Sequence, residues 1–181
     1  MRIISGKARG LKLKTPRGMS TRPTADRIKE SLFNILNNMI DFDGKNVLDL
    51  FAGTGALGLE ALSRGAASVV FVDRSSADCI EDNFNRSHLE NVEILRAEVF
   101  RALERMSDRQ FDLIFADPPY HFGIAQRILS AVSEKNLLAE GGLLILELGV
   151  DEAELSSTTL EKIRRAEYGH TTAIEIFGRM Q

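Results

Sequence analysis

The sequence has very little cysteine and no long hydrophobic run, and each absence excludes a class of protein. A single cysteine, Cys79, allows neither an intramolecular disulfide nor a zinc site built from several cysteines, so we predict no metal. This cysteine usage is typical of a reducing compartment, and we expect a cytoplasmic protein. Apolar runs such as Leu143–Leu146 are only a few residues long, so we predict no membrane span. The basic N-terminal segment is not followed by an apolar stretch, and we therefore expect no secretory signal.

Positive charge is scarce over most of the chain but concentrated near its N-terminus. The formal net charge of −3 by itself weakly disfavours a nucleic-acid partner. Residues 1–30, however, hold nine basic and two acidic side chains, a net charge of +7, while the remainder carries −10. This asymmetry favours contact of the N-terminal segment with a polyanion, and a solvated, partly flexible tail is the alternative.

Length and composition indicate one domain with a short appendage. The chain has 181 residues, of which 44% are hydrophobic and 27% charged, as in an ordinary soluble globular protein. The start of the chain is rich in Gly, Lys and Arg and has a short alternating run at Leu11–Lys14, which indicates a small hairpin or irregular arm. We predict a basic N-terminal arm over residues 1–22 and a folded domain over residues 23–181, and we expect a monomer.

Two helices have clear boundary signals. Apolar residues within 28–40 recur with the 3.6-residue period of one helix face, and we predict that this helix begins at Thr24 and ends near Gly44. In a later helix, Ser75 and Asp78 occupy the positions of a capping box.

From residue 47 onward, strand-like runs alternate with helical patterns. This alternation is typical of a mostly parallel sheet with helices on both faces. The predicted strands of this part are 47–51, 68–73, 92–95, 111–116 and 143–148. Two further strands, 159–168 and 171–177, join around Gly169 without a helix between them and must therefore be antiparallel. The predicted fold class is α/β, a Rossmann-like doubly wound sheet of seven strands that ends in a C-terminal antiparallel hairpin.

A glycine turn follows the first predicted strand, over Phe51–Gly58, and leads into a helix. Gly53, Gly55 and Gly58 satisfy the pattern G-x-G-x-x-G, in which glycine permits positive φ and lets a ligand approach the backbone closely. Asp73, at the end of the next strand, can accept hydrogen bonds from both ribose hydroxyls. The pattern predicts a nucleoside-bearing ligand, with a purely structural turn as the alternative.

Asp49 and Glu98 indicate which nucleoside this is. The carboxylate of Asp49, just ahead of the glycines, would repel a pyrophosphate but could accept from the ammonium group of an amino acid, directly or through water. S-adenosylmethionine carries such an ammonium at one end, and ribose and adenine at the other. Glu98, after the third predicted strand, is placed to accept from the adenine amine. The alternatives are a bond from loop amides to Asp49 and a helix N-terminal role for Glu98.

The motif with the most specific chemistry is Asp117-Pro118-Pro119-Tyr120, at the end of the fourth predicted strand. Two prolines fix φ and remove two N–H donors, which leaves a corner rich in acceptors. Such a corner suits the exocyclic NH₂ of a nucleobase, whose lone pair must be directed at an electrophile. Tyr120 can stack on a base that has been splayed out of a structured nucleic acid. A rigid loop that only ends the strand is the alternative.

Phe51–Gly55 together with Asp117–Tyr120 resembles the S-adenosylmethionine-dependent amino-methyltransferases that act on nucleic-acid bases, class I enzymes with a seven-stranded sheet. The N-terminal runs Arg2–Gly6, Arg22–Arg27 and Glu30–Asn34 are similar to those of the bacterial small-subunit ribosomal RNA (guanine-N2)-methyltransferases of the RsmD type. This resemblance covers essentially the whole chain. It implies methyl transfer to N2 of one guanine in 16S ribosomal RNA, within the assembled or nearly assembled small ribosomal subunit, with S-adenosylhomocysteine as the other product.

The resemblance also assigns catalytic and cofactor-binding roles to residues of the domain over 23–181, according to their positions in the family's motifs. The implied catalytic residues are Asp117, Pro118 and Tyr120. The implied cofactor-binding residues are Asp49, Phe51, Ala52, Gly53, Thr54, Gly55, Asp73, Arg74, Glu98 and Val99. The basic residues predicted to contact RNA are Arg9, Lys12, Arg22 and Arg27. At the position of Glu98 the family often has aspartate.

Three other functions remain open from the residues alone. Adenine N6 and cytosine N4 in DNA also present an exocyclic NH₂, and only the N-terminal resemblance favours guanine in ribosomal RNA. A dehydrogenase that binds a nicotinamide dinucleotide would use the same glycine pattern. A non-catalytic RNA-binding module is disfavoured by the presence of Asp117, Tyr120 and a complete glycine turn.

Overall fold

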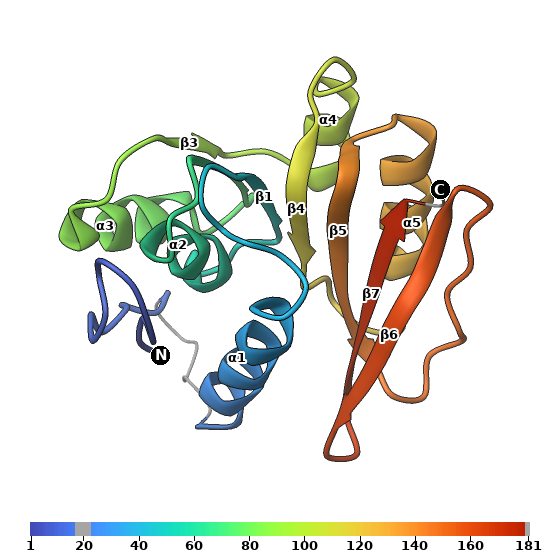
Figure 1. Ribbon diagram of the computed structural model, residues 1–181, viewed down its shortest axis with the longest axis horizontal. Helices are drawn as coiled ribbons and strands as arrows, with labels where there is room; N and C mark the ends of the chain where they lie inside the picture. Colours follow the sequence, from blue (N-terminus) through green and yellow to red (C-terminus); the bar gives the residue numbers. More distant parts are fainter. Residues whose placement is uncertain (17–22, 180–181) are drawn as a thin grey trace.

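The computed structural model describes residues 1–16 and 23–179. In this part of the chain, seven strands form one sheet in the order β3-β2-β1-β4-β5-β7-β6 (Figure 1). Their bounds are Asn46–Leu50 (β1), Ser68–Val72 (β2), Val92–Leu95 (β3), Phe111–Ala116 (β4), Leu138–Gly149 (β5), Leu160–Tyr168 (β6) and Thr172–Arg179 (β7). The first five strands are parallel, and β7 pairs antiparallel with both β5 and β6. The predicted fold class, with its closing hairpin, is confirmed.

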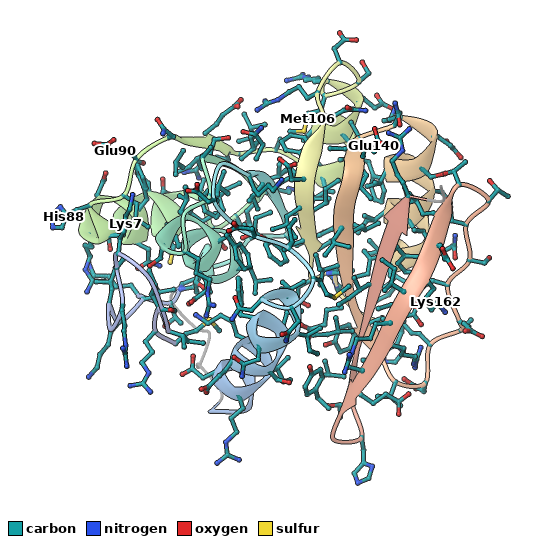
Figure 2. The ribbon with its side chains drawn as sticks, viewed as in Figure 1. Lys7, His88, Glu90, Met106, Glu140 and Lys162 are labelled. Atoms are coloured by element: carbon teal, nitrogen blue, oxygen red, sulfur yellow. The ribbon has the colours of Figure 1, made fainter. Side chains whose placement is uncertain are left out.

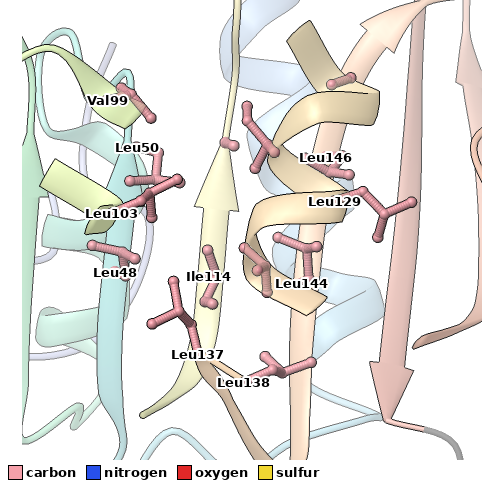
Figure 3. Packing of buried hydrophobic residues seen from close by; sticks show 14 of the residues in the cluster. Leu48, Leu50, Val99, Leu103, Ile114, Leu129, Leu137, Leu138, Leu144 and Leu146 are labelled. Atoms are coloured by element: carbon pink, nitrogen blue, oxygen red, sulfur yellow. The ribbon is translucent and has the colours of Figure 1, made fainter. Parts of the chain in front are cut away.

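Helices cover both faces of the sheet. Their bounds are Pro23–Leu36 (α1), Ala56–Ser63 (α2), Ala77–Ser87 (α3), Val99–Glu104 (α4) and Ile124–Glu134 (α5). Helices α4 and α5 pack on one face, where Leu48 and Leu50 of β1 lie among their buried side chains (Figure 3). Helices α1, α2 and α3 contribute to a second buried cluster, which contains Val47 of β1. Because Val47 alternates with Leu48 along the strand, the two clusters lie on opposite faces.

Helix α1 is shorter than its apolar pattern predicts. It ends at Leu36, and the carbonyl of Leu36 accepts from the amides of both Met39 and Ile40. The side chain of Asn38 donates to the carbonyl of Asn34 at 2.9 Å. An asparagine that bonds to nearby backbone offers an alternative to further helix, so the apolar period continues beyond the helix itself.

Residues 1–16, the described part of the arm, are packed against the domain. Arg2 and Lys12 form an antiparallel bridge, and the side chains of Ile3 and Leu13 are buried in the second cluster. The arm lies beside α2 and α3 (Figure 1). Lys7 extends from this end of the molecule, and Lys162 lies on strand β6 at the other (Figure 2). The alternating pattern of the arm is therefore that of a small hairpin with one apolar face.

Gly6 marks the closest approach of the arm to α2. Its φ is +81°, and a Cβ placed there would lie 1.7 Å from the carbonyl oxygen of Ser63. The same serine is bonded to the arm several times, since its carbonyl accepts from Lys7 N and its hydroxyl from Ala8 N. Only glycine permits both this backbone conformation and this contact.

Candidate functional site

Three carboxylates lie on one face of the sheet, at the carboxyl ends of adjacent strands. Asp49 is on β1, Asp117 directly follows β4, and Glu147 is on β5. In the sheet register Asp49 is paired with Phe115 and Ala116 with Leu146, which places Asp117 level with Glu147. Each acid follows by two positions a residue of the second cluster, namely Val47, Phe115 and Ile145. Since side chains alternate along a strand, all three acids face the side of the sheet that α1 and α2 cover.

Asp49 is the most buried of the three, at 2% exposed. Its Oδ2 accepts at 2.9 Å from the amide of Gly58, which lies in the first turn of α2, so one oxygen bonds to backbone, although to a helix amide and not to the loop amides of the alternative. No other bond to this carboxylate is formed within residues 1–16 and 23–179. Burial, helped by the nearby charges of Asp117 and Asp73 and opposed by the Gly58 amide, raises the pKa of Asp49 to about 8.

The glycine turn has the left-handed backbone that its sequence predicts. Gly53 and Gly55 have φ of +56° and +76°, and Phe51 has φ of +56°, which ends β1 one residue earlier than predicted. Gly58 lies in α2 against β2, where a Cβ would come within 2.3 Å of the Phe71 ring. The first two glycines therefore shape the turn, and the third permits close packing of helix on strand.

Asp73 connects this turn to the start of α3. Its Oδ2 accepts from Gly53 N at 2.9 Å, and its Oδ1 accepts from Ser75 N at 2.8 Å and Ser76 N at 2.7 Å. The predicted capping box of Ser75 and Asp78 is wrong, because α3 begins after Ser76 without a side-chain cap. Asp73 instead satisfies the amides at the start of the helix. A carboxylate has about four acceptor positions, so one remains for a ligand after these three bonds.

The other predicted cofactor residues lie around the same edge of the sheet. Ala52 is buried at the end of β1, and Arg74 is exposed just after β2. Glu98 caps α4, accepting from Arg101 N at 3.0 Å, and Val99 is buried behind it. One carboxylate oxygen of Glu98 therefore caps the helix, as the alternative for this residue predicted.

The Asp-Pro-Pro-Tyr motif forms the corner after β4. Pro118 is buried, Tyr120 is half-buried, and the Tyr120 hydroxyl donates to Glu147 and lies 3.3 Å from Thr172 Oγ1. Burial raises the pKa of Tyr120, and its bond to Glu147 adds to this shift. These contacts fix the Tyr120 ring at its hydroxyl end. The corner therefore presents a positioned aromatic side chain next to the carboxylate of Asp117.

The pKa values of Asp117 and Glu147 are both raised. The surrounding protein raises the pKa of Asp117, and the charge of Glu147 raises it further. Burial also raises the pKa of Glu147, although the bond from Tyr120 opposes the shift. Asp117 itself retains more than a third of its surface in contact with solvent, so water screens part of its shift. Both groups are thereby biased toward holding a proton at a higher pH than ordinary carboxylates.

Glu147 belongs to the site although no sequence motif indicates it. The apolar residues of 143–148 predict a buried strand, and that prediction gives its one acid no role. An acid within an apolar strand next to the Asp-Pro-Pro-Tyr strand is the signal that could have identified it, because a buried charge requires a partner. Here that partner is Tyr120.

The predicted RNA-binding residues lie on the arm and on α1. Arg9, Lys12 and Arg27 are exposed, as contact with phosphates requires, whereas Arg22 lies outside the described residues. In the described ranges no group of three or more His, Cys, Asp or Glu residues could hold a metal ion. None of the described helices is long and apolar enough to cross a membrane.

Comparison with known proteins identifies the family. A family model described as Conserved hypothetical protein 95 matches residues 1–177. Ribosomal RNA small subunit methyltransferase D of Haemophilus influenzae is 37% identical over 157 residues, covering 84% of this chain and 80% of that protein. The solved structure of yhhF from Escherichia coli has a TM-score of 0.85 and 30% identity, covering 99% of this chain and 97% of that one. SMU.776, solved in complex with SAH, shares the fold at a TM-score of 0.66 and 18% identity, covering 87% of this chain and 50% of that one. The chain therefore belongs to the Conserved hypothetical protein 95 family, the RsmD-type ribosomal RNA methyltransferases.

Proposed function

We propose that this protein transfers a methyl group from S-adenosylmethionine to the exocyclic N2 of one guanine in 16S ribosomal RNA, within the small ribosomal subunit. Membership of the family supports ribosomal RNA as the substrate. The observation that carries the chemistry is the alignment of Asp49, Asp117 and Glu147 at adjacent strand ends, beside the glycine turn. One end of this row suits a cationic cofactor and the other an amine.

The residues around the glycine turn fit S-adenosylmethionine better than a dinucleotide. The buried carboxylate of Asp49 would accept from the cofactor's ammonium at the oxygen that does not bond to Gly58. Asp73 and Glu98 each have acceptor capacity beyond their backbone bonds, for one ribose hydroxyl and for the adenine amine respectively. A pyrophosphate placed at the same turn would meet the Asp49 carboxylate. When bound, the cofactor supplies an electrophilic methyl on a sulfonium, which needs no metal.

The corner after β4 would hold the guanine amine. The carboxylate of Asp117 and the carbonyl of Pro118 can accept from the two N–H bonds of N2 and direct its lone pair at the methyl group. Positive charge that develops on the nitrogen is stabilised by the same acceptors. After transfer the nitrogen must lose a proton, and Asp117, with its raised pKa, can accept it. The Tyr120 ring, held through Glu147, would stack on the base.

Methyl transfer to defined substrates tests this proposal. Small subunits purified from a strain that lacks the gene, incubated with the enzyme and tritiated S-adenosylmethionine, should gain about one methyl group per particle. Naked 16S RNA tests whether the assembled particle is needed, and duplex DNA is the competing substrate. Incorporation into duplex DNA but not into subunits would overturn the RNA assignment and favour adenine N6 or cytosine N4.

Replacing Asp73 with alanine should weaken S-adenosylhomocysteine binding by roughly thirtyfold. The change removes the acceptor for three backbone amides, which hold the glycine turn and the start of α3, as well as the proposed ribose contact. Isothermal titration calorimetry measures the affinity. Asp78→Ala, an exposed acid in the first turn of α3, is the matched control and should leave affinity unchanged. An Asp73→Ala variant that binds as tightly as the wild type would show that the glycine turn does not need the Asp73 hydrogen bonds to bind the ligand.

S-adenosylhomocysteine binding should strengthen as pH rises toward 8. Asp49, whose pKa burial raises to about 8, is protonated at lower pH and must lose its proton before it can pair with the ammonium. The expected gain is up to about tenfold per pH unit below 8, followed by a plateau. Calorimetry in buffers of different ionisation enthalpy should detect the released proton. Asp49→Asn should bind weakly with no such pH dependence, and the same slope in this variant would assign the titration to another group.

A further inference from the structure

We propose that Asn83 is a positioning residue that joins the basic arm to the glycine turn, so that RNA binding and cofactor binding strengthen each other. The inference rests on the proposed function, because it assigns RNA to the arm and S-adenosylmethionine to the turn. Asn83 lies on α3, and its side chain is completely buried. No sequence motif indicates a role for it.

The side chain of Asn83 bonds to two distant parts of the backbone. Its Oδ1 accepts from Lys14 N at 2.7 Å, and its Nδ2 donates to Lys14 O at 2.9 Å, so it pairs with the arm as a neighbouring strand would. The same Nδ2 donates to Thr54 O at 3.0 Å. Thr54 stands between Gly53 and Gly55 in the glycine turn. One amide group therefore holds both the arm and the turn.

Neighbouring contacts strengthen the link on the side of the arm. The ammonium of Lys14 forms an ion pair with Asp82 at 2.7 Å, and Asp82 precedes Asn83 on the same helix. Lys12, two residues before Lys14, is exposed and carries one of the charges predicted to meet phosphates. Holding the arm through Lys12 would therefore also hold Lys14 against Asn83.

The turn has a second support that does not involve the arm. Asp73 bonds to Gly53 N, from within the same strand-turn-helix unit. Asp73 therefore orders the turn whether or not RNA is bound, whereas the Asn83 bond to Thr54 depends on an amide that also needs the arm. Buried amides are costly to leave unpaired, so ordering one partner of Asn83 favours ordering of the other. Such coupling is reciprocal, and it affects the two affinities by the same factor.

The test is a thermodynamic cycle on two ligands. Filter binding gives the affinity for small subunits with and without saturating S-adenosylhomocysteine, and the ratio of the two affinities is the coupling factor. We expect a factor of about ten in the wild type and less than two in Asn83→Ala. Asn85→Ala, an exposed asparagine on the same helix, is the matched control and should keep the wild-type factor. Lys12→Ala should weaken subunit binding and also lower the factor, because the contact of Lys12 with phosphate is what would hold Lys14 against Asn83, and an unchanged factor would contradict this route.

The coupling factors of the wild type and of Asn83→Ala decide between the coupling proposal and its absence. A folded Asn83→Ala variant with the wild-type factor, or a wild type without coupling, overturns the inference while leaving the methyltransferase proposal in place. Failure of the wild type to bind S-adenosylhomocysteine at all would instead overturn the proposed function. If Asn83→Ala does not fold, Lys14→Pro tests the same contact from the arm, because proline lacks the N–H that Lys14 donates to Asn83. That variant should lower the factor at least threefold, and an unchanged factor would contradict the proposal.

Discussion

Replacing Asp117 with alanine should reduce methyl transfer about a thousandfold while leaving S-adenosylhomocysteine affinity within about threefold of the wild type. The carboxylate is one of only two acceptors proposed for the guanine amine, and its pKa is raised so that it can take the proton after transfer. The variant leaves the glycine turn intact, because Asp117 bonds to none of its residues within the described ranges. Single-turnover methyl transfer and calorimetry measure the two quantities on the same preparation.

Asp151→Ala provides the matched control for this variant. Asp151 is an exposed acid beyond the end of β5, so its loss changes the net charge equally and should leave the rate within about twofold. Loss of cofactor binding in Asp117→Ala would show that the acid belongs to the cofactor site. A nearly unchanged rate would show that the amine is held elsewhere.

The second large effect is on stability. Glu60→Ala should lower the free energy of unfolding by about 3–5 kcal/mol. Glu60 is fully buried on α2, and its carboxylate pairs with Lys29 of α1 at 3.1 Å. It also accepts from the amides of Ile4 and Ser5 in the arm, at 2.7 and 3.0 Å. Removing it takes away the carboxylate partner of the buried Lys29 ammonium and of the Arg64 guanidinium, which pairs with Glu60 at 2.9 Å, and it leaves two amides without their acceptor, while burial already lowers the pKa of Lys29. Urea unfolding followed by circular dichroism measures the loss.

Two further variants test the physical reason for that loss. Glu81→Ala, an exposed acid on α3, should change stability by less than about 0.5 kcal/mol. The double variant Lys29→Met with Glu60→Leu removes both charges of the Lys29–Glu60 pair, while Arg64 keeps its charge, and it should be less destabilised than the two single changes added together. Strict additivity would mean that the ion pair contributes nothing as a pair.

The sheet could be predicted from the sequence because its signals are local. Alternation of apolar runs with helical patterns predicted five parallel strands, and the short link at Gly169 predicted the antiparallel hairpin. The helix boundaries were predicted wrongly where a side chain bonds to the backbone at the end or the start of a helix. Asn38, which follows α1, donates to the carbonyl of Asn34 within the helix, so the apolar period extends beyond the helix, and Asp73 satisfies the amides that Ser75 was expected to cap.

The site was predicted less completely, because some of its contacts join distant parts of the chain. Asp49 and Asp117 stand beside recognisable motifs, and the register of β1 and β4 brings them together. Glu147 and Asn83 have no motif of their own. Glu147 is identified only when the fold brings Tyr120 to it. Asn83 is identified only when the fold brings Lys14 and Thr54 to it. The roles proposed for all of these residues in binding cofactor and base remain predictions.

The most direct measurement of the central claim is mass spectrometry of 16S ribosomal RNA from a strain that lacks the gene. We expect one guanosine to lose its N2-methyl group, and we expect the wild-type gene to restore the modification while the Asp117→Ala variant does not. Unchanged methylation of every guanosine in the deletion strain, or loss of a methyl group from an adenine or cytosine instead, would contradict it.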